Sequence, residues 1–206
     1  IRVVKVAEVP VTYGGKATHN IMNCLPAVLS TYFWRNISID DIKLALQTFV
    51  PSPAQTPGRL NMFQFKQFKF LVDFAHNPAG LLLLCDFIGK MDGEPKVGII
   101  SGTGDRRDDD IRELGRISGR SFDEIIIRQD KHLRGRTAEE IVNLLVEGIN
   151  ETKTKDIPIK IIYNEKEAIM YAYDNAKPGS LVTIMCDVVA EALDLIKGLK
   201  EKEDSE

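Results

Sequence analysis

The chain has 206 residues, of which 44% are hydrophobic and 28% are charged, the composition of an ordinary globular protein. A net charge of −3 at pH 7 excludes the strongly basic surface by which proteins bind nucleic acid, so no nucleic-acid partner is expected. No apolar run approaches the ~20 residues that cross a bilayer and no signal peptide is visible, so we expect a cytoplasmic protein without a membrane partner.

Residues 1–57 form one compositional unit, which ends in a proline-interrupted linker over 50–58. The unit is expected to contain a strand over residues 3–11, a helix over about 19–34 and a second helix over about 39–49. Ser38 is suited to cap the second helix, and Pro26 should kink the first helix or displace its start. The chain begins with Ile1 and enters the alternating run directly, as a fragment of a longer protein would.

From residue 58 onward, strand-like and helical segments alternate. The expected strands cover residues 59–65, 68–73, 97–101, 124–128, 157–163 and 180–185, and helices are expected to start near Pro78, Arg106, Thr137, Asn164 and Asp187. Some of the strand-like runs are apolar on both faces, as in a parallel sheet covered by helices on both sides. This alternation predicts a doubly wound α/β fold, in which ligands bind beyond the carboxyl ends of the strands.

The most informative stretch runs from Asp73 to Gly80. Asp73 closes an apolar strand-like run, and Pro78 suits the first turn of the helix that follows. His76 and Asn77 would then stand at a helix N-terminus, where an α/β fold binds ligands. The alternative is an ordinary connection in which Asp73 caps the helix and His76 is solvated. Upstream, the amides of Asn20 and Asn23 fall on one helix face and could bind an adenine edge, although N-terminal capping would explain them as well.

Two loops and one carboxylate are further candidates. In the glycine-containing loop 101–108, Arg106 could recognise a carboxylate or a phosphate; the alternative is a tight turn with a solvated helix start. In the loop 130–136, which begins with Asp130, Arg134 and Arg136 flank a glycine and suit an acidic substrate group, although a solvated loop would explain the same charges. Asp187 follows the last strand, where it could pair with a cationic group or cap the final helix.

Taken in order, these segments resemble the Mur ligase family over nearly the whole chain. The runs that carry the resemblance are 9–12, 19–23, 49–53, 57–61, 72–80, 102–108 and 134–136. The resemblance implies that residues 58–206 form the Rossmann-like C-terminal domain of such a ligase, with a mostly parallel six-stranded sheet. Residues 1–57 would be the tail of the central ATPase domain.

The resemblance also implies an activity, that of an ATP-dependent amide ligase that builds a poly-aspartate chain carrying arginine. In this chemistry a carboxylate attacks the γ-phosphate of ATP, and an amine then attacks the acyl phosphate. The partners would be ATP, arginine, aspartate and the poly-aspartate chain, and the full-length parent could be a homo-oligomer. Two alternatives remain: a peptidoglycan or folylpolyglutamate ligase of the same family, or a non-catalytic module that binds a nucleotide or an amino acid.

Residue roles follow from the same resemblance. Asn20 and Asn23 would line the adenine, Arg59 and Asp73 would hold ribose and phosphate, and His76 and Asn77 would act near the γ-phosphate or acyl phosphate. The loops with Arg106, Asp130, Arg134, Arg136 and Asp187 would bind the incoming amino acid. Its carboxylate would suit Arg106, Arg134 or Arg136, and its guanidinium would suit Asp187 or Asp105.

One departure from the family pattern bears on activity. No Gly-x-x-x-x-Gly-Lys-[Ser/Thr] phosphate loop occurs in the sequence. Mg²⁺ would be bound mainly by the missing part of the central domain, and this chain alone is expected to be inactive. The three cysteines lack metal-ligand spacing, so no metal site is expected here.

Overall fold

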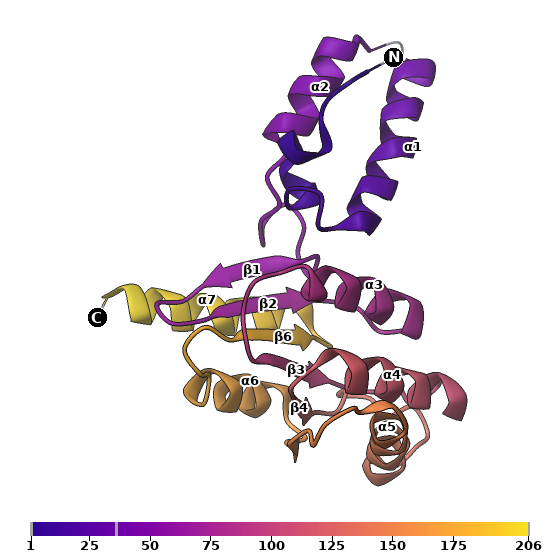
Figure 1. The fold of residues 1–206 in the computed structure, drawn as a ribbon, viewed down its shortest axis with the longest axis vertical. Helices are drawn as coiled ribbons and strands as arrows, with labels where there is room; N and C mark the ends of the chain where they lie inside the picture. The colour runs from indigo at the N-terminus through magenta and orange to yellow at the C-terminus, as the bar shows by residue number, and fades with distance from the viewer. Residues whose placement is uncertain (1, 36, 206) are drawn as a thin grey trace.

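The computed structural model describes residues 2–35 and 37–205, with a pair of helices standing beyond one edge of a sheet (Figure 1). The helical elements are η1 (Val6–Glu8), η2 (Pro10–Thr12), α1 (Thr18–Arg35), α2 (Ile39–Thr48), α3 (Pro78–Gly89), α4 (Asp108–Ser121), α5 (Ala138–Thr152), α6 (Glu165–Asp174) and α7 (Val189–Ser205). The strands are β1 (Asn61–Gln64), β2 (Lys69–Asp73), β3 (Lys96–Ile100), β4 (Glu124–Ile127), β5 (Ile159–Ile161) and β6 (Leu181–Met185).

The six strands form one sheet in the order β1-β2-β6-β3-β4-β5. β1 pairs antiparallel with β2, and the other four pairings are parallel. The predicted mostly parallel, six-stranded α/β fold is therefore confirmed. The helix starts also lie close to their expected places: Thr137 and Glu140 form a capping box at α5, and the Asn164 side chain caps α6.

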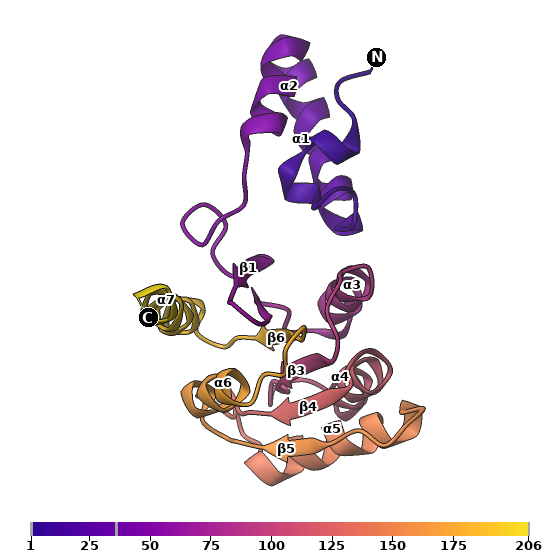
Figure 2. The same ribbon diagram turned by 60° about the vertical axis from the view of Figure 1, so that its left-hand side comes forward.

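Helices cover both faces of the sheet. α3, α4 and α5 lie on one side, and α6 and α7 lie on the other (Figure 2). Successive residues of a strand point to opposite faces, so Leu71 belongs to the core under α3–α5 and its neighbour Val72 to the core under α6 and α7. In β3, Ile100 likewise belongs to the core under α3–α5, and Ile99 belongs to the core under α6 and α7. This arrangement leaves the carboxyl ends of the parallel strands free to form a site.

The strand expected over residues 3–11 is wrong, because this segment forms the two 3-10 turns η1 and η2. Pro10 has no amide hydrogen for a strand ladder and instead begins η2. The Thr12 hydroxyl donates to the Val9 carbonyl (2.8 Å), which closes the turn locally. The following helix α1 runs from Thr18 through Pro26 without a break, and Ser38 caps α2 as expected.

The N-terminal helices reach the α/β part through α3. The Tyr13 ring packs edge-on against Phe87, with 5.1 Å between ring centroids. The Lys90 ammonium group donates to the Thr18 hydroxyl (2.8 Å) and to the carboxylate of Asp86 (2.6 Å). The linker over 50–58 contains no helix or strand, as expected. The contacts of Tyr13 and Thr18 join the start of the chain and of α1 to the C-terminal end of α3.

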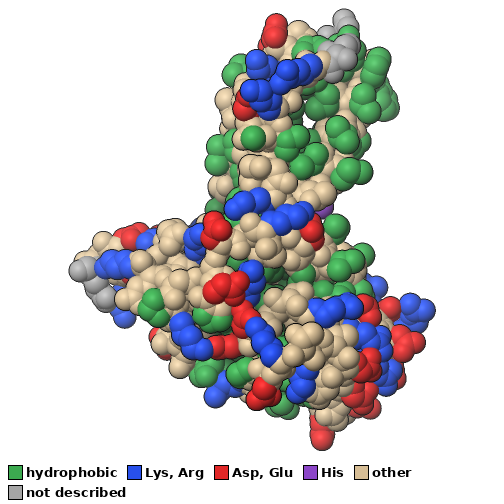
Figure 3. Space-filling view, viewed as in Figure 1, with side chains coloured by type: hydrophobic (Ala, Val, Ile, Leu, Met, Phe, Trp, Pro, Cys, Tyr) green, Lys and Arg blue, Asp and Glu red, His purple; other side chains and the backbone are tan. Residues whose placement is uncertain are grey.

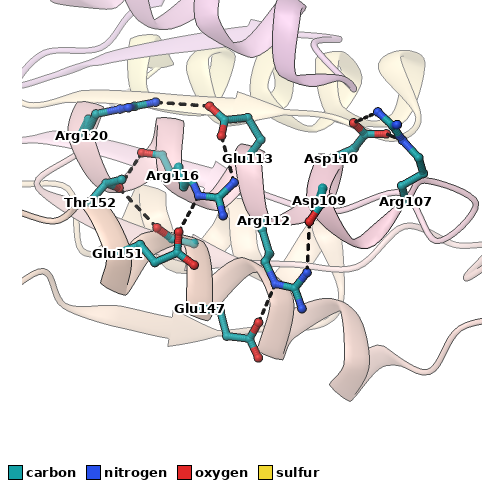
Figure 4. Close-up of polar contacts among 11 residues, drawn as sticks. Arg107, Asp109, Asp110, Arg112, Glu113, Arg116, Arg120, Glu147, Glu151 and Thr152 are labelled. Atoms are coloured by element: carbon teal, nitrogen blue, oxygen red, sulfur yellow. Dashed lines mark hydrogen bonds and ion pairs between the residues drawn. The ribbon is translucent and has the colours of Figure 1, made fainter.

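Helices α4 and α5 pack with their backbones in contact. A Cβ atom on Gly148 would overlap the carbonyl oxygen of Arg112, and one on Gly115 would overlap the carbonyl oxygen of Leu145. Ion pairs lie along the solvent side of this contact, including Arg112 with Glu147 at 2.8 Å (Figure 4). The glycines set the helix separation, and the ion pairs are exposed enough to add little stability.

None of the helices among residues 2–35 and 37–205 is both long enough and apolar enough to cross a membrane.

The close contact between α4 and α5 predicts that two Gly→Ala substitutions change the free energy of unfolding in opposite directions. Gly148→Ala should lower the free energy of unfolding by about 1–3 kcal/mol, because its methyl group has no space against the α4 backbone. Gly198→Ala, in α7, meets no atom within 4 Å and should raise stability by roughly 0.5–1 kcal/mol. Urea denaturation of both variants measures the difference, and equal stability of the two would contradict this account of α4–α5 packing.

Candidate functional site

Asp73 lies at the carboxyl end of β2, where its carboxylate is largely enclosed by protein. Its Oδ2 accepts a hydrogen bond from the backbone N–H of Leu60 (2.9 Å). Burial raises the pKa of Asp73 above its ordinary value, and the Leu60 N–H and the Arg59 guanidinium oppose this rise. A carboxylate held by one amide at the edge of a cavity is a good acceptor for hydroxyl groups of a ligand.

Leu60 is held in an unusual backbone conformation. Its φ is +49°, in the left-handed region that costs a non-glycine residue roughly 1–2 kcal/mol. Its N–H is bound by Asp73, and its carbonyl accepts from the Tyr13 hydroxyl. Burial, with a smaller contribution from Asp73, raises the pKa of Tyr13 to about 12, so the phenol stays protonated and donates. The strained residue thus joins the N-terminal segment to the end of β2.

The loop before β1 is fixed by a buried amide. Asn61 is 2% exposed, and its Oδ1 accepts from the Gly58 N–H (2.7 Å). Gly58 has a φ of +67°, and a Cβ atom there would overlap Val189, so only glycine fits. The loop presents Arg59 outward, with its guanidinium carbon 5.6 Å from the centroid of the Phe74 ring. Arg59 is therefore exposed and preordered beside Asp73.

The turn after Asp73 presents a helix N-terminus. The Oδ1 atom of Asn77 accepts from the Gly80 N–H (2.8 Å), so Asn77, and not Asp73, is the N-cap of α3. His76 is exposed, and its Nδ1 donates to the Phe74 carbonyl (3.0 Å), which leaves Nε2 for a ligand. The N-terminus of a helix carries partial positive charge and favours anions such as phosphate.

A cavity of about 260 Å³ lies between α1 and the start of α3, and we call it the α1–α3 cavity. Six of the residues selected from the sequence line it: Asn20, Asn23, Arg59, Asp73, His76 and Asn77. His19 lines it as well, and its pKa is lowered because burial disfavours the charged imidazole. The Asn20 amide already donates to the Val11 carbonyl (2.8 Å), so its carbonyl oxygen remains for a ligand.

A larger cavity, of about 870 Å³, lies between the loops after β4 and β6 and the helices α6 and α7; we call it the α6–α7 cavity. Asp130 and Asp187 line it together with Glu165. The Oδ2 atom of Asp187 accepts from the backbone N–H of Lys131 (2.7 Å), in the loop after β4. Five carboxylates and two lysines line the cavity, which favours a cationic ligand group.

The arginines selected from the sequence lie on two neighbouring loops and do not line the α6–α7 cavity. Arg136 donates to the carbonyls of Gly104 and Arg106 (both 2.9 Å) and so binds the loop after β3 to the loop after β4. Arg134 is paired with Asp105 at 2.6 Å. The Nε of Arg106 is buried and lacks a hydrogen-bond partner among the described residues.

Sequence reasoning missed three residues that shape these cavities: Tyr13, Arg128 and Glu165. Arg128 is 2% exposed at the end of β4, where it contacts Asp130 (2.7 Å) and Glu165 (3.0 Å). An arginine that ends an otherwise apolar strand was the available signal, because a buried guanidinium requires partners. The roles of Tyr13 and Glu165 depend on long-range contacts and left no local pattern.

Within the part of the chain that the structure describes, no three His, Cys, Asp or Glu side chains are grouped so as to hold a metal ion.

The sequence and the fold are both similar to those of known proteins. The family profile described as "Mur ligase, glutamate ligase domain" matches residues 58–187. The chain is 39% identical over 196 residues to a cyanophycin synthetase of Crocosphaera subtropica, covering 95% of this chain and 22% of that protein. It is 37% identical over 200 residues to a cyanophycin synthetase of Synechocystis sp., covering 97% of this chain and 23% of that protein.

Among solved structures, a Mycobacterium tuberculosis folylpolyglutamate synthase complexed with ADP and AMPPCP superposes with a TM-score of 0.65 at 21% identity. The superposition covers 87% of this chain and 40% of that one. At this identity the likeness concerns the fold alone. The chain spans less than a quarter of the two cyanophycin synthetases it matches. On the profile match and these identities, the chain belongs to the Mur ligase family.

Proposed function

We propose that this chain is the C-terminal part of an ATP-dependent amide ligase of the cyanophycin synthetase type, in which it completes the nucleotide site and binds the incoming amino acid. The observation that carries the proposal is the convergence of Asn20, Asn23, Arg59, Asp73, His76 and Asn77 on one cavity. These residues come from three separate segments of the chain. Similarity to cyanophycin synthetases supports arginine and aspartate as the substrates.

The α1–α3 cavity would hold one side of ATP. Its volume of about 260 Å³ is below the ~300–1,000 Å³ of complete small-molecule sites, so the chain would supply one wall of a shared site. The Asp73 carboxylate suits the ribose hydroxyls, and the N-terminus of α3 suits a phosphate. Asn20 and Asn23 would face the adenine. The phosphate loop and the ligands of Mg²⁺ would belong to another part of the complete polypeptide, because the described residues provide neither.

The α6–α7 cavity and its neighbouring loops would receive the amino acid. A guanidinium group of the substrate would enter among carboxylates that include Asp130 and Asp187. The substrate carboxylate would be bound by Arg106 or Arg134, as bidentate arginine contacts allow. Arg136 would fix the separation of the two loops through its bonds to the carbonyls of Gly104 and Arg106. The two cavities lie at the carboxyl ends of neighbouring parallel strands, which suits a reaction between their ligands.

In the reaction, phosphoryl transfer would activate an acceptor carboxylate, and the bound amino acid would then form the amide bond. The contribution of this chain would be positioning. Asp73 orients the nucleotide, and His76 and Asn77 stand beside its phosphates at the start of α3. The acidic cavity holds the side chain of the amino acid, so that its amine reaches the activated carboxylate.

Residues 1–57 would be the tail of the central ATPase domain. Supporting this division, α1 exposes large apolar side chains: Phe33 is 75% exposed and Trp34 is 85% exposed. Figure 3 shows hydrophobic side chains along α1, next to a group of charged ones, whereas charges of both signs crowd the surface over α4 and α5. An apolar surface of this kind on a soluble monomer marks an interaction site. In the complete polypeptide it would pack against the rest of the central domain.

The most direct test of the activity uses the complete polypeptide that contains this chain, here called the intact protein. ATP turnover should depend on arginine supplied with an acceptor that ends in aspartate, and glutamate or diaminopimelate should not replace arginine. Release of phosphate measures the turnover. Turnover with glutamate or diaminopimelate alone would favour a folylpolyglutamate or peptidoglycan ligase. Absence of turnover with every amino acid would favour a non-catalytic binding module.

Asp73→Asn in the intact protein should raise the KM for ATP about tenfold, because a hydrogen bond to a charged group contributes roughly 1.5–3 kcal/mol. Asp92→Asn is the matched control, since the Asp92 side chain is 92% exposed and outside the cavity. Steady-state kinetics measure both variants. An unchanged KM for ATP in Asp73→Asn would remove Asp73 from the nucleotide site.

The same Asp73→Asn variant should be more stable than the wild type at pH 7. The raised pKa of Asp73 means that the folded state disfavours the ionised carboxylate. Wild-type stability therefore falls as the pH rises from the unfolded pKa of ~3.9 through the folded pKa, and asparagine escapes this loss. The stability difference should vanish below pH ~3.9. Thermal unfolding measured across this range would contradict the account if the difference stayed constant with pH.

A further inference from the structure

The carboxyl ends of β4 and β6 and the start of α6 are joined by one buried guanidinium group. Arg128, which follows β4, donates from Nε to the Met185 carbonyl at the end of β6 (3.1 Å). Its Nη1 donates to Asp130 Oδ1 (2.7 Å), and its Nε lies 3.0 Å from Glu165 Oε2. Nη1 also donates to the carbonyl of Gln129 (3.0 Å). Nearly all of its donors are therefore used inside the protein.

The contacts continue outward from these two carboxylates. The Ser101 hydroxyl, after β3, donates to Asp130 Oδ1 (3.0 Å). The backbone N–H of Asp187 donates to Glu165 Oε2 (2.6 Å), and the Asp187 carboxylate accepts from the Lys131 N–H (2.7 Å). One continuous network thus fixes the positions of Asp130, Glu165 and Asp187. All three line the α6–α7 cavity, whereas Arg128 does not.

The charges of this network are unequal. A single guanidinium is in direct contact with the carboxylates of Asp130 and Glu165, and the backbone N–H of Asp187 donates to Glu165. The side chains of Asp130 and Glu165 are 13% and 15% exposed, so each is mostly enclosed and still reaches the cavity. Two lysines on the rim, Lys131 and Lys166, also line the cavity, and Lys131 is already paired with Glu191. The side chains that line the α6–α7 cavity therefore carry more negative than positive charge.

We infer that Arg128 is a positioning residue, which holds the carboxylates of Asp130 and Glu165 in place to bind the cationic side chain of the amino-acid substrate in the α6–α7 cavity. This inference rests on the proposed function and names the group that organises its amino-acid site. Arg128 itself makes no contact with the substrate. Without it, the two carboxylates would repel each other, and each would move toward solvent or take up a proton.

The test compares kinetic parameters in the intact protein. Arg128→Gln should raise the KM for arginine at least tenfold and change the KM for ATP less than twofold. Arg128→Lys keeps one positive charge and should recover part of the loss. Arg116→Gln is the matched control, because Arg116 bridges Glu151 and Glu113 on α4 and α5, away from both cavities. This control should leave both KM values unchanged.

Glu165→Gln covers the case in which Arg128→Gln does not fold, since it keeps the size of the side chain and removes one charge. It should raise the KM for arginine and leave the KM for ATP unchanged. A parallel rise of both KM values in a folded variant, or no rise for arginine, would overturn the inference. If the wild type used an uncharged amino acid and Arg128→Gln still raised its KM selectively, the cationic substrate would be wrong and the positioning role would stand. Absence of amino-acid-dependent turnover in the wild type would overturn both the cationic substrate and the positioning role of Arg128.

Discussion

The site depends on one hydrogen bond, from the Leu60 backbone N–H to the Asp73 carboxylate. It holds Leu60 in a left-handed conformation and turns the Leu60 carbonyl toward the Tyr13 hydroxyl. Through this pair of contacts the N-terminal helices, the linker and the end of β2 meet at one place. The same bond opposes the rise in the pKa of Asp73 that burial causes. Leu60 and Asp73 both lower the stability of the folded protein, because a left-handed leucine and a buried charge are unfavourable.

The sheet topology explains why two cavities lie along one edge. β6 lies between β2 and β3, so the end of the chain returns to the middle of the sheet and brings Met185 level with Asp73. The α1–α3 cavity forms on the β2 side, and the α6–α7 cavity forms on the side of β4 and β5. Parallel strands place their carboxyl ends together, so residues far apart in sequence become neighbours. Arg128 reinforces this edge by its bond to the Met185 carbonyl.

Much of the α/β part could be predicted from the sequence, because its signals are local. The apolar strand-like runs, the prolines and the helix caps at Thr137 and Asn164 depend on neighbouring residues alone. The strand predicted over residues 3–11 was wrong because alternating apolar and polar residues form a strand only where a partner strand pairs with them. This segment forms 3-10 turns instead. Residues of the α1–α3 cavity were found from motifs. Arg128, Glu165 and Tyr13 were missed because each depends on a contact between distant parts of the chain: Arg128 and Glu165 are 37 residues apart, and Tyr13 and Leu60 are 47 apart.

In the proposed function, ATP lies against the α1–α3 cavity. Amide hydrogen exchange of the intact protein, with and without a non-hydrolysable ATP analogue, measures whether it does. We expect the analogue to slow exchange in residues 18–24, 59–61 and 73–80, and to leave exchange in α5 unchanged. Protection confined to the loop 129–136, with none at the turn between β2 and α3, would contradict it.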